Sequence, residues 1–526
     1  MRTVFAGVAA AVLTLGCMTP GWAGNAPRVQ VTRGWLQGRT QGPVDVFLGI
    51  PYAAPPVGAY RWRAPRPAQP WHGLRRADRF GASCSQPLVR NGFGPWTPEY
   101  FPHGAVSENC LYLNVWTPRK RTGPMAVLVW IPGGGFIGGS GSVPVYNGAR
   151  LAARGIVVVS INYRLGPFGF LTTPALAAQA RRDHEPPGNY GLQDVIAALR
   201  WIQQNVAAFG GTPRQVTIAG QSAGAITVQD LLVSPLAMGL YQRAIAESGL
   251  PTTVPSVHLA QAERAGEAFM RAHGIGTLAA LRALSPRALQ PAGAFMSGPR
   301  FFPIIDGEVV PAAVDRLIGD GRARQVPVLI GMNANERSAS SPLTRTLSGR
   351  LWQAFLRRNF GAMAPTFARL YPDRTARQRA RAKRALQTDL GRAALYHWAR
   401  LWLGHAQTPV YAYLWTHAEP GPQSAKWGAF HTSEVPYVFD TLDRSPGRPF
   451  TAADRAIARR MSAYWVDFVK TGSPNGPGLP TWPRLAHPQG PIMRLGARMM
   501  PEPMLPHRVL SAMRTFMARG GKTGLF

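Results

Sequence analysis

The chain has 526 residues, of which 46% are hydrophobic and 16% charged, and its formal net charge is +33. This apolar content excludes an intrinsically disordered chain, and the length predicts one large α/β domain or two ordinary ones. The positive charge is nearly all arginine, spread along the chain and densest over Arg374–Arg384. It could hold the protein weakly on an anionic membrane surface or steer anionic substrates, or it could reflect only codon bias. No nucleic-acid-binding motif accompanies it, so no nucleic-acid partner is expected.

The first 23 residues have the pattern of a secretory signal peptide. Arg2 provides a basic start, Val4–Leu15 is apolar, and Gly21-Trp22-Ala23 is a small-x-small cleavage site. We therefore expect a secreted or periplasmic protein whose mature chain starts near Gly24. A lipoprotein anchored at Cys17 is the alternative. No later apolar run approaches the roughly 18 to 20 residues that span a bilayer, so the mature chain is expected to be soluble.

The three cysteines agree with export. If Cys17 leaves with the signal peptide, Cys84 and Cys110 remain as an even pair in an oxidising compartment. A bridge between them would close a loop of about 26 residues and contribute roughly 3.5 kcal/mol on the chain-entropy model. Two free buried thiols are the alternative.

Apolar β-rich runs alternate with helix-like runs along the first half of the chain. Val127–Ile131 and Ile156–Ile161 are nearly continuous apolar strands, which is typical of a parallel sheet covered on both faces. Leu192–Val206 has apolar residues at helical spacing. Later strands are predicted at Val326–Met332 and Val410–Trp415. This βαβ order predicts a large, mostly parallel, doubly wound sheet.

The stretch between the last two strands reads differently. Residues 340–405 are helical in pattern and very basic, and we expect them to form a helical cap insertion over the strand ends. No convincing linker interrupts the chain, so residues 24–526 are predicted to form a single domain.

Gly220-Gln221-Ser222-Ala223-Gly224 is a G-x-S-x-G pentapeptide between the β-branched run Gln215–Ile218 and the helix-forming run Ala225–Val233. Strand before and helix after are the context of a nucleophile elbow, in which the chain reverses sharply and presents the serine at the tip. The helix also begins just after the serine, so its free N–H groups lie where an oxyanion would form.

A serine hydroxyl is a weak nucleophile, and it needs a histidine to take its proton and an acid to orient that histidine. In this fold class the acid and then the histidine follow the serine along the chain. His431 is favoured among the six late histidines because it follows the small-residue turn Gly428-Ala429-Phe430. His397 and His405 lie on a helical stretch and are expected to be structural.

The acid should lie in a loop just past the carboxyl end of a strand. Glu336 follows the predicted strand ending at Met332 by such a loop. Asp194, Asp306 and Glu434 remain alternatives, each more easily interpreted as a structural hydrogen-bonding group.

The glycine run Gly133-Gly134-Gly135 directly follows the strand that ends at Ile131. Glycines there would let backbone N–H groups turn toward a cleft and form an oxyanion hole. A merely flexible turn is the alternative.

Together these residues resemble the type-B carboxylesterase family, the carboxylesterase and cholinesterase branch of the α/β-hydrolase superfamily. The resemblance runs from about Val29 to Trp482 and implies an α/β-hydrolase fold. Its landmarks, besides the elbow, are Phe47–Ala53, Ser107–Val115, Gly133–Phe136, Asn162–Gly166, Gly188–Asp194, Phe209–Gly211, and Gly428–His431 with Glu434 and Tyr437.

The resemblance implies a role for several positions. Ser222 would be the nucleophile, Glu336 the orienting acid and His431 the general base of an enzyme that hydrolyses small-molecule carboxylic esters. It implies no metal and no organic cofactor. The remaining implied positions are the oxyanion donors Gly134, Gly135 and Ala223, the Cys84–Cys110 disulfide, and a buried Glu108–Arg164 ion pair.

Two departures from the family pattern bear on the site. Pro132 stands where the family usually has His before the glycine run, which could stiffen that loop. Gln221 stands where the family usually has Glu before the nucleophile, and the lost negative charge weakens any preference for cationic substrates such as choline esters.

Three questions about function stay open at this point. The scissile bond could be another acyl bond, such as an amide, a thioester or a natural-product side-chain ester. A non-catalytic adhesion or binding protein is a more distant alternative. The aromatic residues Phe93, Trp96, Tyr100 and Phe101 could line the substrate pocket or pack beneath their loop.

Overall fold

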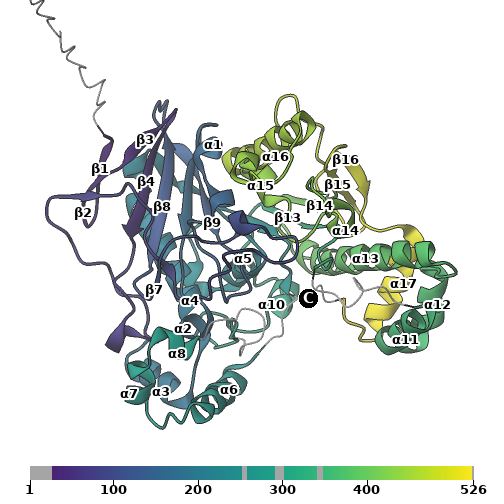
Figure 1. The fold of residues 1–526 in the computed structure, drawn as a ribbon, viewed down its shortest axis with the longest axis horizontal. Coiled ribbons are helices and arrows are strands. Elements are labelled where there is room, and N and C mark those ends of the chain that lie inside the picture. Colours follow the sequence, from purple (N-terminus) through teal and green to yellow (C-terminus); the bar gives the residue numbers. More distant parts are fainter. Residues whose placement is uncertain (1–25, 252–256, 291–300, 340–347, 524–526) are drawn as a thin grey trace, which may run out of the picture.

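The computed structural model describes residues 26–251, 257–290, 301–339 and 348–523 (Figure 1). The expected signal peptide and Cys17 lie outside the described residues.

Strands from both ends of the chain form one large sheet of eleven strands, in the order β16-β15-β14-β13-β12-β11-β9-β10-β8-β4-β3. The block from β15 to β10 is parallel, and antiparallel strands complete both edges. The expected mostly parallel sheet is therefore confirmed. The strands are β1 (Arg28–Val31), β2 (Gly34–Gln37), β3 (Arg39–Gln41), β4 (Val44–Pro51), β5 (Leu74–Arg76), β6 (Ser83–Cys84), β7 (Val106–Ser107), β8 (Tyr112–Pro118), β9 (Met125–Ile131), β10 (Val157–Ile161), β11 (Gly211–Gln221), β12 (Arg243–Glu247), β13 (Val328–Asn333), β14 (Val410–Trp415), β15 (Pro491–Leu495) and β16 (Met500–Pro503).

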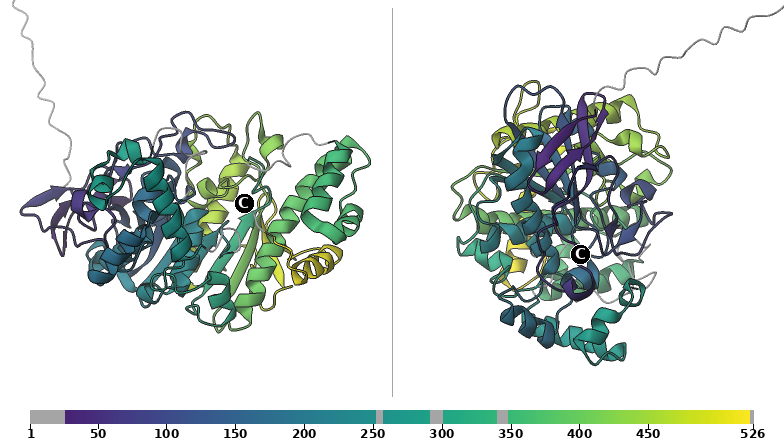
Figure 2. Two further views of the ribbon diagram at one scale, coloured as in Figure 1. Left: turned by 90° about the horizontal axis from the view of Figure 1, so that it is seen from below. Right: turned by 90° about the vertical axis from the view of Figure 1, so that its left-hand side faces the viewer.

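Helices cover both faces of this sheet, and further helices gather at two corners of the molecule (Figures 1 and 2). None of the described helices is both long enough and apolar enough to cross a bilayer. The helices are α1 (Ala149–Ala152), α2 (Gly166–Phe170), α3 (Pro174–Arg182), α4 (Tyr190–Asn205), α5 (Ala223–Val233), α6 (Leu259–Ala272), α7 (Leu278–Ala283), α8 (Pro286–Leu289), α10 (Val314–Gly319), α11 (Gly349–Phe360), α12 (Ala364–Leu370), α13 (Ala376–Leu403), α14 (Ser424–Trp427), α15 (Val435–Val438), α16 (Ala452–Thr471) and α17 (His507–Ala518).

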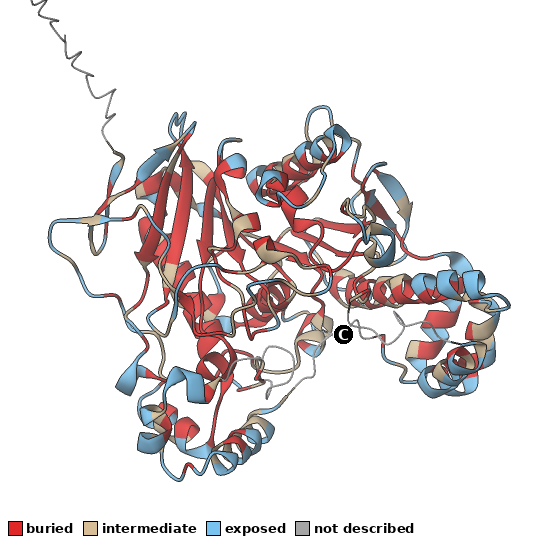
Figure 3. Cartoon of the chain, viewed as in Figure 1, coloured by how far each residue is buried: buried red, intermediate tan, exposed pale blue. Residues whose placement is uncertain are grey.

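The central strand β9 shows how the sheet divides the core in two. Its residues alternate between the faces, as side chains of a strand must. Val127, Val129 and Ile131 pack into the cluster that holds α4 and α5, whereas Leu128 and Trp130 pack into the cluster that holds α15 and α16. All five side chains are buried. The central strands of the sheet are coloured as buried along most of their length (Figure 3). This two-sided burial explains why the strand reads as one continuous apolar run.

The predicted helical insertion is present as α11, α12 and α13, which pack with α17 into a group of four helices that we call the helical lobe. The lobe stands at the edge of the molecule beyond β14 (Figure 1). Phe360, Phe367 and Phe516 form its aromatic core, with the rings of Phe360 and Phe367 stacked 3.8 Å apart. His397 lies within α13, as expected of a structural residue.

The expected Glu108–Arg164 ion pair is wrong. Arg164 instead donates two hydrogen bonds of 2.8 Å to the carboxylate of Asp194 at the start of α4. Glu108 accepts two from Arg61. Each of the two carboxylates thus has its own guanidinium. Arg61, which no sequence pattern singled out, lies between Glu108 and the carbonyl groups of the α7 segment.

Candidate active site

Ser222 lies at the tip of a sharp turn between β11 and α5. Its φ of 58° and ψ of −123° are unusual for a residue with a side chain, and such a conformation costs on the order of 1–3 kcal/mol. The turn is held by close packing: a Cβ atom added to Gly224 would lie 2.0 Å from the carbonyl oxygen of Ile131. The sheet and helix therefore hold Ser222 in one orientation, with its hydroxyl toward the cleft.

The structure brings Ser222, His431 and Glu336 together from three separate loops. His431 Nε2 lies 2.8 Å from Ser222 Oγ, and Nδ1 lies 2.5 Å from Glu336 Oε2. An imidazole with its proton on Nδ1 donates to Glu336 and accepts from the serine hydroxyl. Glu336 is 4% exposed and His431 9%. This arrangement can remove a proton from Ser222 and stabilise the imidazolium that results.

Hydrogen bonds join the loop that carries Glu336 to the loop that carries His431. The side-chain amide of Asn333, the last residue of β13, donates to the carbonyl of Phe430, and the backbone N–H of Asn333 donates to Glu336 Oε1. Asn335 exchanges hydrogen bonds with Ala429 through its backbone N–H and its side-chain oxygen. The distance between acid and base is therefore set by a strand end rather than by two independent loops.

The glycine loop after β9 lies directly over the elbow. A Cβ atom added to Gly133 would lie 3.0 Å from Ser222 Cβ. Gly134 has a φ of +124°, which turns its peptide in a way that a residue with a side chain rarely adopts. Within the described part of the chain, the N–H groups of Gly134 and Gly135 donate to no other residue. Ala223 begins α5, so its N–H also lacks an intrahelical acceptor.

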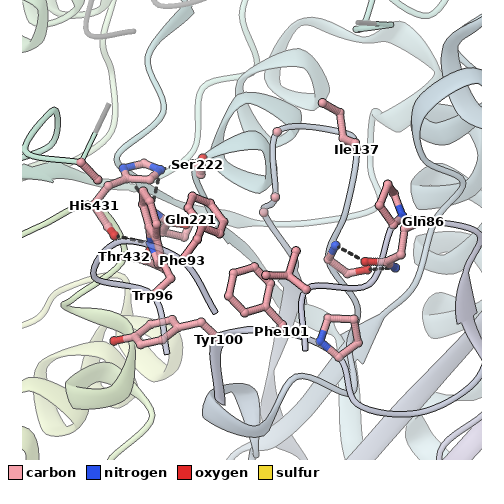
Figure 4. A pocket seen from close by; sticks show the side chains of 18 of the residues that line it. Gln86, Phe93, Trp96, Tyr100, Phe101, Ile137, Gln221, Ser222, His431 and Thr432 are labelled. Atoms are coloured by element: carbon pink, nitrogen blue, oxygen red, sulfur yellow. Dashed lines mark hydrogen bonds between the residues drawn. The ribbon is translucent and has the colours of Figure 1, made fainter. Parts of the chain in front are cut away.

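Ser222 and His431 open into a cavity of about 260 Å³. Its walls are mostly apolar. The four aromatic residues considered in the sequence, Phe93, Trp96, Tyr100 and Phe101, all line it (Figure 4). Among the described lining residues, Glu336 is the only carboxylate, His431 is the only imidazole, and there is no lysine or arginine. The remaining wall comes from Gln86, Pro87, Val89, Phe93, Trp96, Tyr100, Phe101, Pro102, Ile137, Tyr146 and Ala339.

Most of this wall belongs to one loop, which the Cys84–Cys110 disulfide closes. The side-chain amide of Gln86 accepts from the N–H of Gly139 and donates to its carbonyl, both at 2.8 Å, so it clamps the glycine loop. On the other side of the cavity, the indole N–H of Trp96 lies 3.0 Å from the carbonyl oxygen of His431 and from Thr432 Oγ1 (Figure 4). The disulfide loop therefore contacts both the glycine loop and the histidine loop.

Two further carboxyl groups are buried behind the triad. Burial raises the pKa of Glu247 to about 8, although the indole N–H of Trp465 donates to it. The pKa of Glu434 is also raised well above its usual value, first by burial and then by the nearby carboxylates of Glu247 and Glu336. Glu434 accepts from the amide of Asn333. Glu434 thus supports the loop that carries the acid, as a structural hydrogen-bonding group.

Known esterases resemble this chain in sequence and in fold. The Carboxylesterase family profile matches residues 25–509. Among curated proteins, a fumonisin B1 esterase of Sphingopyxis macrogoltabida is 35% identical over 87% of this chain and 84% of its own, and a para-nitrobenzyl esterase of Bacillus subtilis is 34% identical over 86% and 91%. Human carboxylesterase 5A is 33% identical over 90% and 86%. A solved PNB esterase structure superposes with a TM-score of 0.75 at 31% identity, covering 92% of this chain and 99% of that one.

The chain belongs to the carboxylesterase family. It is a carboxylic ester hydrolase with the α/β-hydrolase fold, as the elbow and its neighbouring motifs indicated. Small-molecule esters are the substrates that the family implies. In the described part of this carboxylesterase, no three His, Cys, Asp or Glu side chains lie together as a metal site would require.

Two features of this carboxylesterase escaped the sequence interpretation. One is the clamp by Gln86, and the other is the hydrogen bond from Trp96, which was considered only as a possible lining residue, to the histidine loop. Only a tertiary contact reveals them, because Trp96 reaches a carbonyl 335 residues away. A third feature was foreseen only as a lost charge: the amide nitrogen of Gln221 lies 3.2 Å from His431 Nε2 and 3.5 Å from Nδ1, against the imidazole ring.

Proposed function

We propose that this protein hydrolyses carboxylic esters through an acyl-enzyme on Ser222, with His431 as general base, Glu336 as its orienting acid, and the N–H groups of Gly134, Gly135 and Ala223 as the oxyanion hole. The observation that carries the proposal is the continuous hydrogen-bonded chain from Glu336 through His431 to Ser222, which opens into the apolar cavity.

The reaction proceeds in two halves. His431 takes the proton of Ser222 as its oxygen attacks the ester carbonyl, and the negative charge that develops on the carbonyl oxygen is stabilised by the three backbone donors. His431 then gives this proton to the leaving alcohol, and the acyl group stays on Ser222. In the second half, His431 takes a proton from water, the hydroxide attacks the acyl carbonyl, and the proton returns to Ser222 as the carboxylic acid leaves.

The chemistry is tested by Ser222→Ala. We expect turnover of a p-nitrophenyl ester to fall by about 10⁴-fold or more, and labelling by a fluorophosphonate probe to disappear. The matched control is Ser511→Ala, at an exposed position of α17, which should turn over the ester and take the label as the unmodified enzyme does. Full turnover by Ser222→Ala would overturn the proposal, and labelling that Ser222→Ala abolishes would exclude a purely adhesive protein.

The cavity supports an uncharged substrate group next to the scissile bond. Apart from the triad, its described lining is neutral, so a charged group entering it would lose hydration without gaining a counter-ion. The relatives are named for fumonisin B1 and for para-nitrobenzyl esters, and this difference leaves the alcohol part open. An ester panel that varies acyl length and alcohol charge, with amide and thioester analogues of the best member, would rank the scissile bonds by kcat/KM.

We also propose that the protein is exported, with the mature chain beginning near Gly24. The Cys84–Cys110 disulfide supports this, because such bonds persist in oxidising compartments. The amino-terminal sequence of the protein from the periplasm and medium of its host tests the proposal. A start near residue 24 is expected, whereas a lipid-modified start at Cys17 would establish the lipoprotein alternative.

A further inference from the structure

The outer surface of the helical lobe concentrates positive charge. Residues 349–403 contain eleven arginines and one lysine but only two aspartates and no glutamate. On α13, Arg377, Arg381 and Arg384 follow one another at i, i+4 and i+7 and are all exposed, so they form a stripe along one face. Exposed Arg374 precedes the first turn of this helix. The opposite face of α13 is buried, as Figure 3 shows.

A second stripe lies on α11. Arg350 and Arg357 are seven residues apart and exposed, on the face opposite the buried Trp352. The two helices that carry these arginines are neighbours, because a Cβ atom added to Gly349, the first residue of α11, would lie 3.2 Å from Arg379 Nη1 of α13 and 3.6 Å from Asp373 Oδ2. We define the lobe's basic surface as Arg350, Arg357, Arg374, Arg377, Arg381 and Arg384.

The guanidinium groups of this surface have no ion-pair partner among the described residues. Across the described residues, no carboxylate lies within 4 Å of any of the six. Arg61, Arg164 and Arg448, by contrast, each pair with a carboxylate in the main body. Residues 349–403 have twelve basic and two acidic side chains, against 58 and 25 in the whole chain, so the charge is more one-sided here than an even enrichment in arginine would make it. An unneutralised group of like charges is a surface that attracts an anionic partner.

We propose that this basic surface binds anionic phospholipid membranes and holds the enzyme at them peripherally. Guanidinium groups pair with phosphate oxygens through two parallel hydrogen bonds, which suits a layer of phospholipid headgroups. Leu351, 54% exposed beside Arg350, supplies an apolar side chain at the same surface. Single-stranded nucleic acid fits less well, because no exposed aromatic side chain of the described lobe offers a base a stacking platform.

The test uses the full mature protein and two variants of equal charge. In the lobe variant, Arg374, Arg377, Arg381 and Arg384 are replaced by Gln. In the matched control, four exposed arginines at the opposite corner, which also lack an ion pair among the described residues, are replaced by Gln. These are Arg182, Arg264, Arg271 and Arg287, from α3, α6 and α8. Co-sedimentation is measured with vesicles of phosphatidylcholine alone and with vesicles containing about one-third phosphatidylglycerol, at low salt and at roughly 0.5 M salt.

We expect binding only to the vesicles with phosphatidylglycerol, lost at high salt, and weakened by at least about tenfold in the lobe variant but less than about twofold in the control. Hydrolysis of a p-nitrophenyl ester should be unchanged in both variants. If the lobe variant and the control lost vesicle binding equally, binding would depend on the net charge of the whole protein, and the proposal would be overturned. Absence of binding by the unmodified protein would also overturn it, as would tighter lobe-dependent binding to single-stranded DNA than to the vesicles.

Discussion

Residue 221 directly precedes the serine of the elbow and contacts the histidine of the site. Gln221 is buried, lines the cavity and places its amide against the ring of His431, so the position faces the proposed general base. A carboxylate at this distance would favour the protonated ring, because an opposite charge within about 4–6 Å stabilises the charged form.

Gln221→Glu should therefore move the acid limb of the kcat/KM profile to higher pH, by about one unit, because an imidazolium cannot act as base. The variant should also gain activity on cationic choline esters relative to neutral ones. Gln221→Met, which removes the amide without adding charge, is the control and should keep the original midpoint. Identical midpoints for Gln221→Glu and the unmodified enzyme would contradict this role.

At the scale of elements, the disulfide loop from Cys84 to Cys110 has two tasks. It supplies most of the apolar wall of the cavity, and it fastens the glycine loop and the histidine loop on either side. Trp96 performs both tasks at once, since its ring lines the cavity and its N–H meets the carbonyl of His431. A variant of Trp96 that lacks the N–H but keeps an aromatic ring separates its role in positioning His431 from its role in lining the cavity.

Trp96→Phe should lower kcat by about tenfold and change KM by less than about twofold, because the carbonyl of His431 loses its donor while the aromatic wall persists. Fluorophosphonate labelling should slow by a similar factor. The control is Trp427→Phe, whose indole N–H donates to Gln423 within its own helix turn and does not contact the triad. A raised KM at unchanged kcat would show that Trp96 serves the wall alone.

At the scale of the whole molecule, buried acids under the sheet's carboxyl edge link stability to pH. The pKa of Glu247 lies near 8 in the folded protein, well above that of a glutamate in an unfolded chain. The folded state therefore binds an additional proton between about pH 4.5 and 8. This contribution to stability is complete below the unfolded pKa and is lost as the pH rises through the folded one.

We thus expect the Tm of the unmodified protein to fall between pH 5 and 8.5. In Glu247→Gln the fall should be smaller by roughly 2–5 °C, because the amide keeps an acceptor for Trp465 and has no charge to bury. Differential scanning calorimetry across this range checks the expectation. Glu308→Gln, at an exposed loop position, should follow the unmodified protein. Parallel curves for all three proteins would contradict the linkage.

Local patterns predicted the framework of the site. The elbow, the glycine run and the strand that ends before Glu336 are each short-range features, so strand and helix periodicity placed them correctly. Partners chosen across the fold were harder. Glu108 was paired with Arg164, whereas each has a different partner, because two buried acids and two arginines of matching chemistry offer more than one pairing.

In the proposed mechanism, chemistry and selectivity depend on different parts of this chain. The triad is set by strand ends and a sharp turn, whereas the cavity wall is set by a covalently closed loop near the surface. Substitutions in that loop could change the accepted substrates over generations while the reaction stays intact. Gln86 and Trp96 are the exceptions, since each also holds a loop of the site, so the disulfide loop is constrained at these two residues and at its cysteines and is freer to diverge between them.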